Sequence, residues 1–245
     1  MKVFRTLALL AVAASSQAAT VTWTEYKPNG TEIASGTFTT TCGLVLSFGD
    51  SCAEPSAFSA TGVHFSMTGS TSARNIDGLN TELIATAVVT SLDGTRGMVA
   101  MQWDQLFYPD FFYSYDPTVS VVDSYTLTGG FALASPAADS KIVASKTQQT
   151  IFGPVSFPSL VATSDAGPTF SVGPETKTYA PNFGNGLWTT VRVSFQFLGA
   201  SITAGDAMDI PVSTSTSVPA SPVPEPAAWW LAGGALLAMR RLAQR

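Results

Sequence analysis

The sequence predicts an all-β protein whose folded body is a single β-sandwich or jelly-roll-like domain. Only 12% of the residues are charged, and the chain is rich in Thr, Ser, Val, Phe and Gly, a composition that favours strands over helices. Short segments of alternating apolar and polar residues recur between turn residues, and no long amphipathic helix separates them. A body of about 190 residues suits one such domain.

The clearest strand is Leu187–Phe197. Apolar and polar side chains alternate from Thr190 to Phe197, which predicts one buried face and one wet face. Further strands are expected at Thr20–Tyr26, Ile33–Thr40, Leu44–Phe48, Val63–Met67, Glu82–Thr90, Met98–Trp103, Val119–Leu127, Lys141–Ala144 and Ser201–Ala204. Asp93-Gly94 predicts a hairpin between two of them, Glu82–Thr90 and Met98–Trp103. Asp165–Tyr179, with two Gly-Pro pairs, is expected to be a long loop.

Four regions follow along the chain. Residues 1–18 combine a basic start, a short apolar run and small residues before Ala19, the pattern of a secretory signal peptide. Residues 19–210 form the β-sandwich body. Residues 211–222, rich in Ser, Thr and Pro, are expected to be an extended, disordered linker. Residues 223–245 form a C-terminal segment with a short apolar helix.

The C-terminal segment is a tripartite signal. It opens with Val223, Pro224, Glu225 and Pro226, continues with the uncharged run Ala227–Met239 and closes with Arg240 and Arg241. At about 1.5 Å per residue the apolar run covers roughly 20 Å of a hydrocarbon core about 30 Å thick, so it is short for a permanent span. The prolines keep the segment before it extended, and the arginines favour a cytoplasmic C-terminus.

This order of elements resembles the PEP-CTERM sorting signal of Gram-negative bacteria, although the resemblance covers only about a tenth of the chain. It implies transient insertion into the inner membrane and cleavage near Pro224–Pro226 by an exosortase-like membrane protease. It also implies delivery to the cell surface or extracellular matrix, often with exopolysaccharide. The alternative is an ordinary C-terminal anchor that is never cut.

The charge of the body argues against one class of partner, and its cysteines predict a disulfide. Seven Lys and Arg stand against 16 Asp and Glu between Ala19 and Pro224, a formal charge of −9, which argues against nucleic acid as a partner. Cys42 and Cys52 are the only cysteines, and in an exported protein they predict one disulfide. No motif indicates a cofactor.

The densest aromatic cluster is Trp103–Tyr115. If exposed, its aromatic rings would stack on sugars beside Asp104 and Asp110, and the glycan-binding candidates are Trp103, Tyr108, Tyr113 and Tyr115. The alternative is that these aromatics fill the sandwich core. Asp104 paired with Asp110 or Asp116 is a weaker glycosidase candidate, because carboxylate separation cannot be read from sequence.

The sequence offers no catalytic motif and no metal motif. His64 is the only histidine, expected on the polar face of a strand without an orienting partner, and therefore dispensable. Gly49-Asp50-Ser51 fails as a serine-protease motif because Cys52 and Ala53 follow it. Asp77-Gly78 and Asp93-Gly94 lack calcium-loop spacing and favour turns.

The leading interpretation is an exported, non-enzymatic surface or matrix protein associated with exopolysaccharide or biofilm. A carbohydrate-binding module that uses the Trp103–Tyr115 aromatics is the first alternative. It would be distinguished by aromatics exposed in a flat row. A secreted hydrolase is the second, and it requires a pocket converging on His64 or on paired carboxylates.

Overall fold

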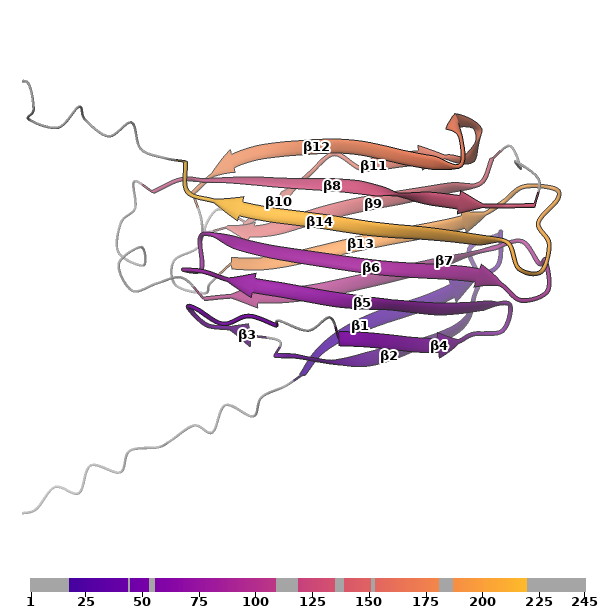
Figure 1. The fold of residues 1–245 in the computed structure, drawn as a ribbon, viewed down its shortest axis with the longest axis horizontal. Helices are drawn as coiled ribbons and strands as arrows, with labels where there is room; N and C mark the ends of the chain where they lie inside the picture. The colour runs from indigo at the N-terminus through magenta and orange to yellow at the C-terminus, as the bar shows by residue number, and fades with distance from the viewer. Residues whose placement is uncertain are drawn as a thin grey trace, which may run out of the picture.

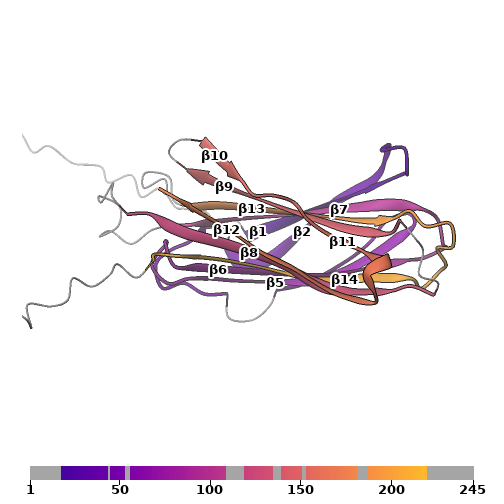
Figure 2. The ribbon, with the colours of Figure 1, turned by 90° about the horizontal axis from the view of Figure 1, so that it is seen from above.

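The body is a sandwich of two β-sheets packed face to face (Figures 1 and 2). The computed structural model describes residues 18–43, 45–52, 56–108, 119–134, 139–150, 153–180 and 187–219. Apart from one short parallel contact, all pairings between these strands are antiparallel. The prediction of an all-β sandwich is therefore confirmed.

Sheet A has eight strands. Its main path runs through β10 (Gly153–Ser156), β9 (Lys141–Thr150), β13 (Leu187–Phe197), β7 (Gly97–Phe107), β1 (Ala18–Tyr26) and β2 (Glu32–Gly43). Two short strands flank this path: β11 (Leu160–Thr163) pairs with β9, and β3 (Val45–Leu46) pairs in parallel with β7. The predicted strand Leu187–Phe197 is matched residue for residue by β13.

Sheet B has six strands. Its order is β12 (Thr169–Tyr179), β8 (Val121–Ala132), β14 (Ala207–Ser217), β6 (Thr81–Ser91), β5 (Phe65–Asn75) and β4 (Ser56–Thr61). A 3₁₀ turn, Ser164–Ala166, precedes β12. The strand β14 lies in the interior of this sheet, paired with β6 on one side and β8 on the other.

Alternating apolar side chains from both sheets fill the space between them. Phe65 of sheet B packs on Phe197 of sheet A, with ring centroids 4.8 Å apart. At the β2 and β4 edges Phe38 stacks on Phe58 at 4.5 Å. Ring pairs of this kind add to the area they bury, so they fix how the sheets face one another.

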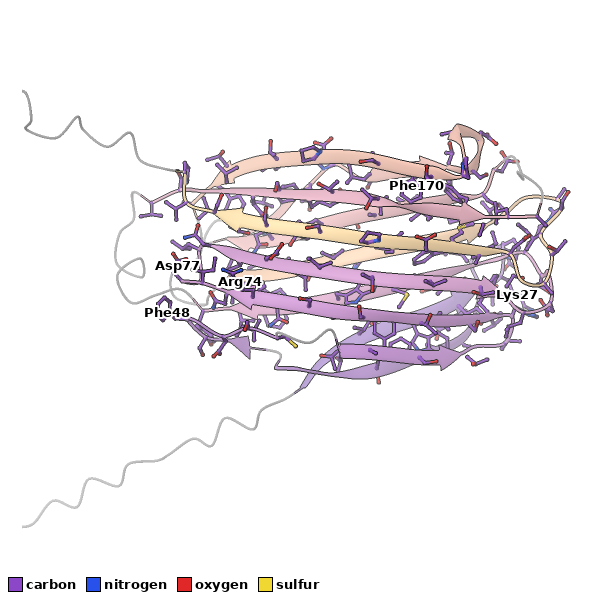
Figure 3. All side chains as sticks on the ribbon, viewed as in Figure 1. Lys27, Phe48, Arg74, Asp77 and Phe170 are labelled. Carbon is purple, nitrogen blue, oxygen red and sulfur yellow. The ribbon has the colours of Figure 1, made fainter. Side chains whose placement is uncertain are left out.

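The two ends of the sandwich differ. We call the end formed by Ser47–Cys52, Ile76–Asn80 and Tyr108 the loop end, and the opposite end, with Lys27, the turn end (Figure 3). Toward the loop end several core-facing strand positions carry polar side chains: Asp123, Lys146, Gln148, Thr189, Thr214 and Thr216 are all buried. Buried polar groups require partners, so this end is held by specific hydrogen bonds.

The predicted linker is wrong over most of its length. Pro211–Ser217 belong to β14, and Val212 is fully buried. The alternation that begins at Met208 continues through Thr214 and Thr216, where small hydroxyl side chains replace aliphatic ones. A Ser/Thr/Pro-rich composition is typical of a linker, so the prediction missed the strand. Pro211 is tolerated because pairing with β8 is interrupted at Ile210 and Pro211, where Gly129 has a positive φ of 146°.

Three further expectations are corrected. The Asp93-Gly94 turn is not a hairpin, because it carries the chain from β6 in sheet B to β7 in sheet A. The segment Asp165–Tyr179 is mostly the edge strand β12, which pairs with β8 through a register shift between Val172 and Glu175. Ser201–Ala204 is a turn segment and not a strand.

Several predictions fall on residues outside the described part of the chain. These are residues 1–17 of the predicted signal peptide, the end of the predicted linker and the whole C-terminal segment, with Val223, Pro224, Glu225, Pro226, Arg240 and Arg241. The described ranges include no helix with the length and hydrophobicity of a membrane span. Cys52 is in a disulfide, and no free cysteine occurs in the described part. The side chain of Cys42 is not described, so the Cys42–Cys52 pairing stays a prediction.

The position of β14 in the sheet interior makes a prediction about stability. Val212→Asp places an unpaired carboxylate between Ala85 and Leu127, in an apolar interior. We expect a loss of about 4 kcal/mol or more, a large share of the stability of an ordinary domain. Urea unfolding followed by tryptophan fluorescence measures it.

The matched control is Val161→Asp, since Val161 on β11 is 47% exposed. Its free energy of unfolding should change by less than about 1 kcal/mol. Equal stability of the Val212→Asp variant and the unmodified protein would mean that residues 211–217 are not a core strand.

Candidate functional site

The structure divides the predicted aromatic cluster. Trp103 and Phe107 are each 1% exposed and lie in the core, so Trp103 is wrong as a glycan-binding candidate. They face inward because they share the core-facing register of β7 with Val99 and Met101. Tyr108, directly after β7, is 43% exposed. Tyr113 and Tyr115 lie outside the described residues.

Tyr108 is held at the loop end by a buried asparagine. The Asn75 side-chain amide donates hydrogen bonds to the carbonyl oxygens of Leu46 at 2.6 Å and of Tyr108 at 2.9 Å. The Tyr108 backbone N–H donates to Leu46 O at 3.0 Å. Asn75 thus joins the end of β5 in sheet B to β3 and β7 in sheet A and fixes the backbone that presents the tyrosine ring.

A cleft of about 530 Å³ opens beside these residues. Its walls are the segment Gly49–Cys52 on one side and the end of β5, with Arg74, Asn75 and Ile76, on the other. Glu82 of β6 also lines it. Figure 3 shows Phe48, Arg74 and Asp77 together at this end. The volume lies in the range of ligand-binding pockets.

The cleft combines charged groups with exposed apolar rims. Arg74 and Glu82 are directly opposite in the β5–β6 register, yet no ion pair joins one to the other. Neither of them forms an ion pair with any other described residue. Phe48 is 60% exposed and Ile76 46% exposed. A guanidinium and a carboxylate in the cleft, with a free aromatic ring beside it, are groups that bind sugar hydroxyls and sugar faces.

The segment Ser47–Cys52 is itself ordered by local hydrogen bonds. The Ser47 N–H donates to the Asp50 carboxylate at 2.7 Å, and the Asn75 N–H donates to Asp50 O at 2.9 Å. The Cys52 N–H donates to Ala73 O at 2.8 Å. Phe48 is therefore presented by a turn that is tied to β5, although the sequence had suggested a strand through residue 48.

A second polar surface, on the outer face of sheet A, is satisfied within itself. Both carboxylate oxygens of Asp104 accept hydrogen bonds, from Gln102 and from Thr190, each at 2.6 Å. Arg192 in turn donates to Gln102 at 2.6 Å. A ligand would have to displace these bonds, so this surface is a weaker site than the cleft. Asp110 and Asp116, the proposed glycosidase partners of Asp104, are not described.

His64 differs from the expectation. It lies in the turn before β5 and not within a strand, and it has a partner: its Nδ1 is 2.7 Å from Asp93 Oδ2. This hydrogen bond is the largest cause that lowers the pKa of Asp93 to about 2, and bonds from Thr95 lower it further. The sequence could not reveal the pair, because the two residues are 29 positions apart in the chain.

The same turn is anchored from sheet A by a buried carboxylate. Glu25 is fully buried, and its two oxygens accept the backbone N–H groups of Val63 at 2.8 Å and His64 at 2.9 Å. A Cβ on Gly62 would lie 2.0 Å from this carboxylate, so a larger residue there would force the Glu25 side chain to move. Glu25 therefore ties the two sheets at the turn end, a structural role that accounts for its burial.

The acidic turns are occupied by backbone contacts. Asp77 accepts the N–H groups of Leu79 at 2.9 Å and Asn80 at 2.6 Å, and Asp93 accepts that of Thr95 at 2.9 Å. These are the Asx-turn bonds that the sequence favoured over calcium. The described residues contain no group of three or more His, Cys, Asp or Glu able to hold a metal ion.

The comparisons identify no family for the chain. No family model and no curated protein matches it. One similar solved structure comes from a study of the promiscuous specificity of carbohydrate-binding modules of the β-sandwich superfamily. It is 10% identical, covers 80% of this chain and 84% of that chain, and has a TM-score of 0.24. A score that low supports no inference about function.

The His64–Asp93 contact predicts a pH dependence that can be measured on one carboxyl. In the His64→Gln variant the pKa of Asp93 should rise from about 2 toward its ordinary value of 3.8, because the main hydrogen bond is lost. The folded-state pKa is depressed, so the contact stabilises above about pH 3.8 and is lost as pH falls through 2. Carbon-13 NMR titration of the carboxyl measures both values.

The part of the Asp93 pKa shift that remains in this variant should come from the hydrogen bonds of Thr95. Thr95→Val, which removes the side-chain bond, is therefore the companion variant. A pKa of Asp93 that stays near 2 in the His64→Gln protein would contradict the assigned cause.

Proposed function

We propose that this chain is an exported, non-enzymatic protein of the cell surface or extracellular matrix, sorted by its C-terminal segment. The segment Val223–Pro226 is recognised by an exosortase-like protease after transient insertion of the apolar run Ala227–Met239 into the inner membrane. Cleavage near the Pro-Glu-Pro motif then releases the body. The observation that carries the proposal is the complete, correctly ordered tripartite signal in the sequence.

The fold gives this proposal a structural context. The last core strand, β14, ends at Ser217, and only five residues separate it from Val223. The Val218 N–H still donates to the Asn80 side chain at 3.1 Å. Cleavage at the motif would therefore remove none of the described strands, and the released body would keep its sandwich.

The test is the intact mass of the protein recovered from the cell surface or medium. The expected species ends near Pro226 and lacks Trp229 and the terminal arginines. A surface species that still ends at Arg245 would show an ordinary anchor. Replacing Pro224, Glu225 and Pro226 by alanine should accumulate unprocessed protein in the inner membrane, because the apolar run and the arginines still insert. Replacing Pro219, Ser221 and Pro222 by alanine, upstream of the motif, is the matched control and should be processed normally.

A second function is favoured by the loop-end cleft: the body binds extracellular polysaccharide there. Arg74 and Glu82 supply donors and acceptors for hydroxyl groups in the cleft, and Phe48 and Tyr108 have exposed rings beside it that can stack on sugars. Tyr108 is retained from the sequence-based candidates, and Phe48 and Arg74 are added to it. A protein that is delivered into an exopolysaccharide matrix would meet such a polymer at high concentration.

Native gel electrophoresis in gels cast with xanthan or hydroxyethyl cellulose tests this binding. The retardation seen with the unmodified protein should fall about tenfold or more in Phe48→Ala and Tyr108→Ala, because each removes an exposed ring beside the cleft. Trp188→Ala is the matched control, since Trp188 is 37% exposed on the outer face of sheet A. Equal loss in all three variants, or no retardation by any polymer, would refute a binding site at this cleft.

A further inference from the structure

A lysine and an aspartate meet in the interior of the sandwich, between the two sheets. Lys146 lies on β9 of sheet A and Asp123 on β8 of sheet B, and the side chains of both are 0% exposed. The Lys146 amine is in direct contact with Asp123 Oδ1. Both residues occupy core-facing positions in the strand alternation, Lys146 after Ile142 and Ala144, and Asp123 before Tyr125.

The surroundings of the amine are poor in polar groups. The Phe157 ring lies under it, with the nitrogen 5.1 Å from the ring centroid. Its other acceptor among the described residues is the carbonyl oxygen of Ser124, at 3.5 Å. An ammonium group carries three donors, so one close acceptor and one distant one leave it incompletely solvated. Burial accordingly lowers the pKa of Lys146, and attraction to Asp123 opposes this.

The second carboxyl oxygen has a separate partner. The Tyr179 hydroxyl, from β12, donates to Asp123 Oδ2 at 2.8 Å. Burial first, and then the charge of Asp123, raises the pKa of Tyr179, so the hydroxyl keeps its proton. The carboxyl group thus presents one oxygen to an amine and the other to a fixed hydrogen-bond donor. This arrangement polarises the carboxyl carbon toward the amine.

We propose that Lys146 and Asp123 condense to an amide that covalently joins the two sheets. Transfer of the proton within the buried pair leaves a neutral amine and a neutral carboxyl group. The lone pair of Nζ attacks Cγ of Asp123, a C–N bond forms, and the charge that develops on Oδ2 is stabilised by the Tyr179 hydroxyl. The Cγ–Oδ1 bond then breaks, and Oδ1 leaves as water with the carboxyl proton and one amine proton. No oxidant, reductant or cofactor is required.

The position of the bond gives it a consequence for the fold. β8 and β9 follow one another in the chain but belong to different sheets, so no backbone ladder connects them. An amide between residues 123 and 146 would close the chain across this crossover and hold the sheets together at the loop end. Such a link protects an exported protein against local opening and proteolysis, whatever the body binds.

The mass of the denatured full-length protein tests the proposal. We expect a mass lower by one water, about 18 Da, than that of the same chain with a disulfide as its only modification. Tryptic digestion of the denatured, reduced protein should yield a branched peptide that contains Asp123 and Lys146, with no cleavage after Lys146. Complete cleavage after Lys146 in the unmodified protein would refute the cross-link.

Loss of water has another source that the mapping must separate. Asp77-Gly78 and Asp93-Gly94 are sequences at which an aspartate can cyclise onto the next backbone nitrogen with loss of one water. Such a ring is opened by hydroxylamine, whereas an amide between side chains survives it. A mass deficit that disappears with hydroxylamine, or that maps to residue 77 or 93, counts against the proposal.

Two variants give a matched comparison. Lys146→Met should restore the full mass. Lys177→Met should keep the deficit: Lys177 is the cross-strand neighbour of Asp123 and its amine also lies near the Phe157 ring, at 5.6 Å, but that amine donates to Ser156 O. Tyr179→Phe should slow formation of the bond and leave a mixture of masses. Persistence of the deficit in Lys146→Met would overturn the assignment, and if that variant does not fold, the peptide map of the unmodified protein still decides.

Discussion

Burial of one face of every long strand between two sheets is the constraint on which this structure depends. Side chains alternate with a period of two along a strand, so every second side chain of each strand points into the space between the sheets. Phe65 against Phe197 and Phe38 against Phe58 show the outcome where both sheets contribute aromatic rings. Register, sheet order and the facing of the two layers all follow from keeping these positions inside.

The same constraint explains why departures from it are informative. Asp123 and Lys146 hold core-facing positions that an aliphatic residue would fill at less cost, because a buried pair rarely repays the dehydration of its charges. Glu25 is as deeply buried, but its carboxylate accepts two backbone N–H groups of a turn, which accounts for it structurally. The Asp123 carboxyl instead faces an amine and a phenol, groups that can react with it and polarise it. This difference in partners is the reason to assign chemistry to one buried carboxyl and packing to the other.

The sequence predicted the class of fold because alternation is local. Leu187–Phe197 contains its whole pattern within eleven residues, and it matches β13. Prediction failed where the signal depends on another part of the chain. Pro211–Ser217 looks like a linker by composition, and only the neighbouring strands β6 and β8 make its threonines core residues. Asp93-Gly94 has hairpin chemistry, but whether a turn joins strands of one sheet or of two is decided by the whole topology.

The candidate site was predicted in part for the same reason. An aromatic run signals stacking or packing equally well, and the register of β7 sends Trp103 inward while the end of that strand leaves Tyr108 outside. Arg74 and Glu82 line a cleft beside Phe48 only because β5, β6 and the segment Ser47–Cys52 converge at the loop end. No sequence motif predicts that these residues converge, because Phe48 and Glu82 are 34 positions apart in the chain.

The loop end also connects the two proposed functions. The described chain begins and ends at this side of the sandwich (Figure 1), and Val218 is hydrogen-bonded to Asn80 in the loop next to the cleft. Five further residues reach Val223 and span at most about 18 Å when fully extended. Under the proposed sorting route, an anchored body would hold its cleft close to the membrane surface, where a bulky polymer has restricted access. Cleavage at the Pro-Glu-Pro motif would free that end of the sandwich, so release from the membrane and exposure of the binding cleft would be one event.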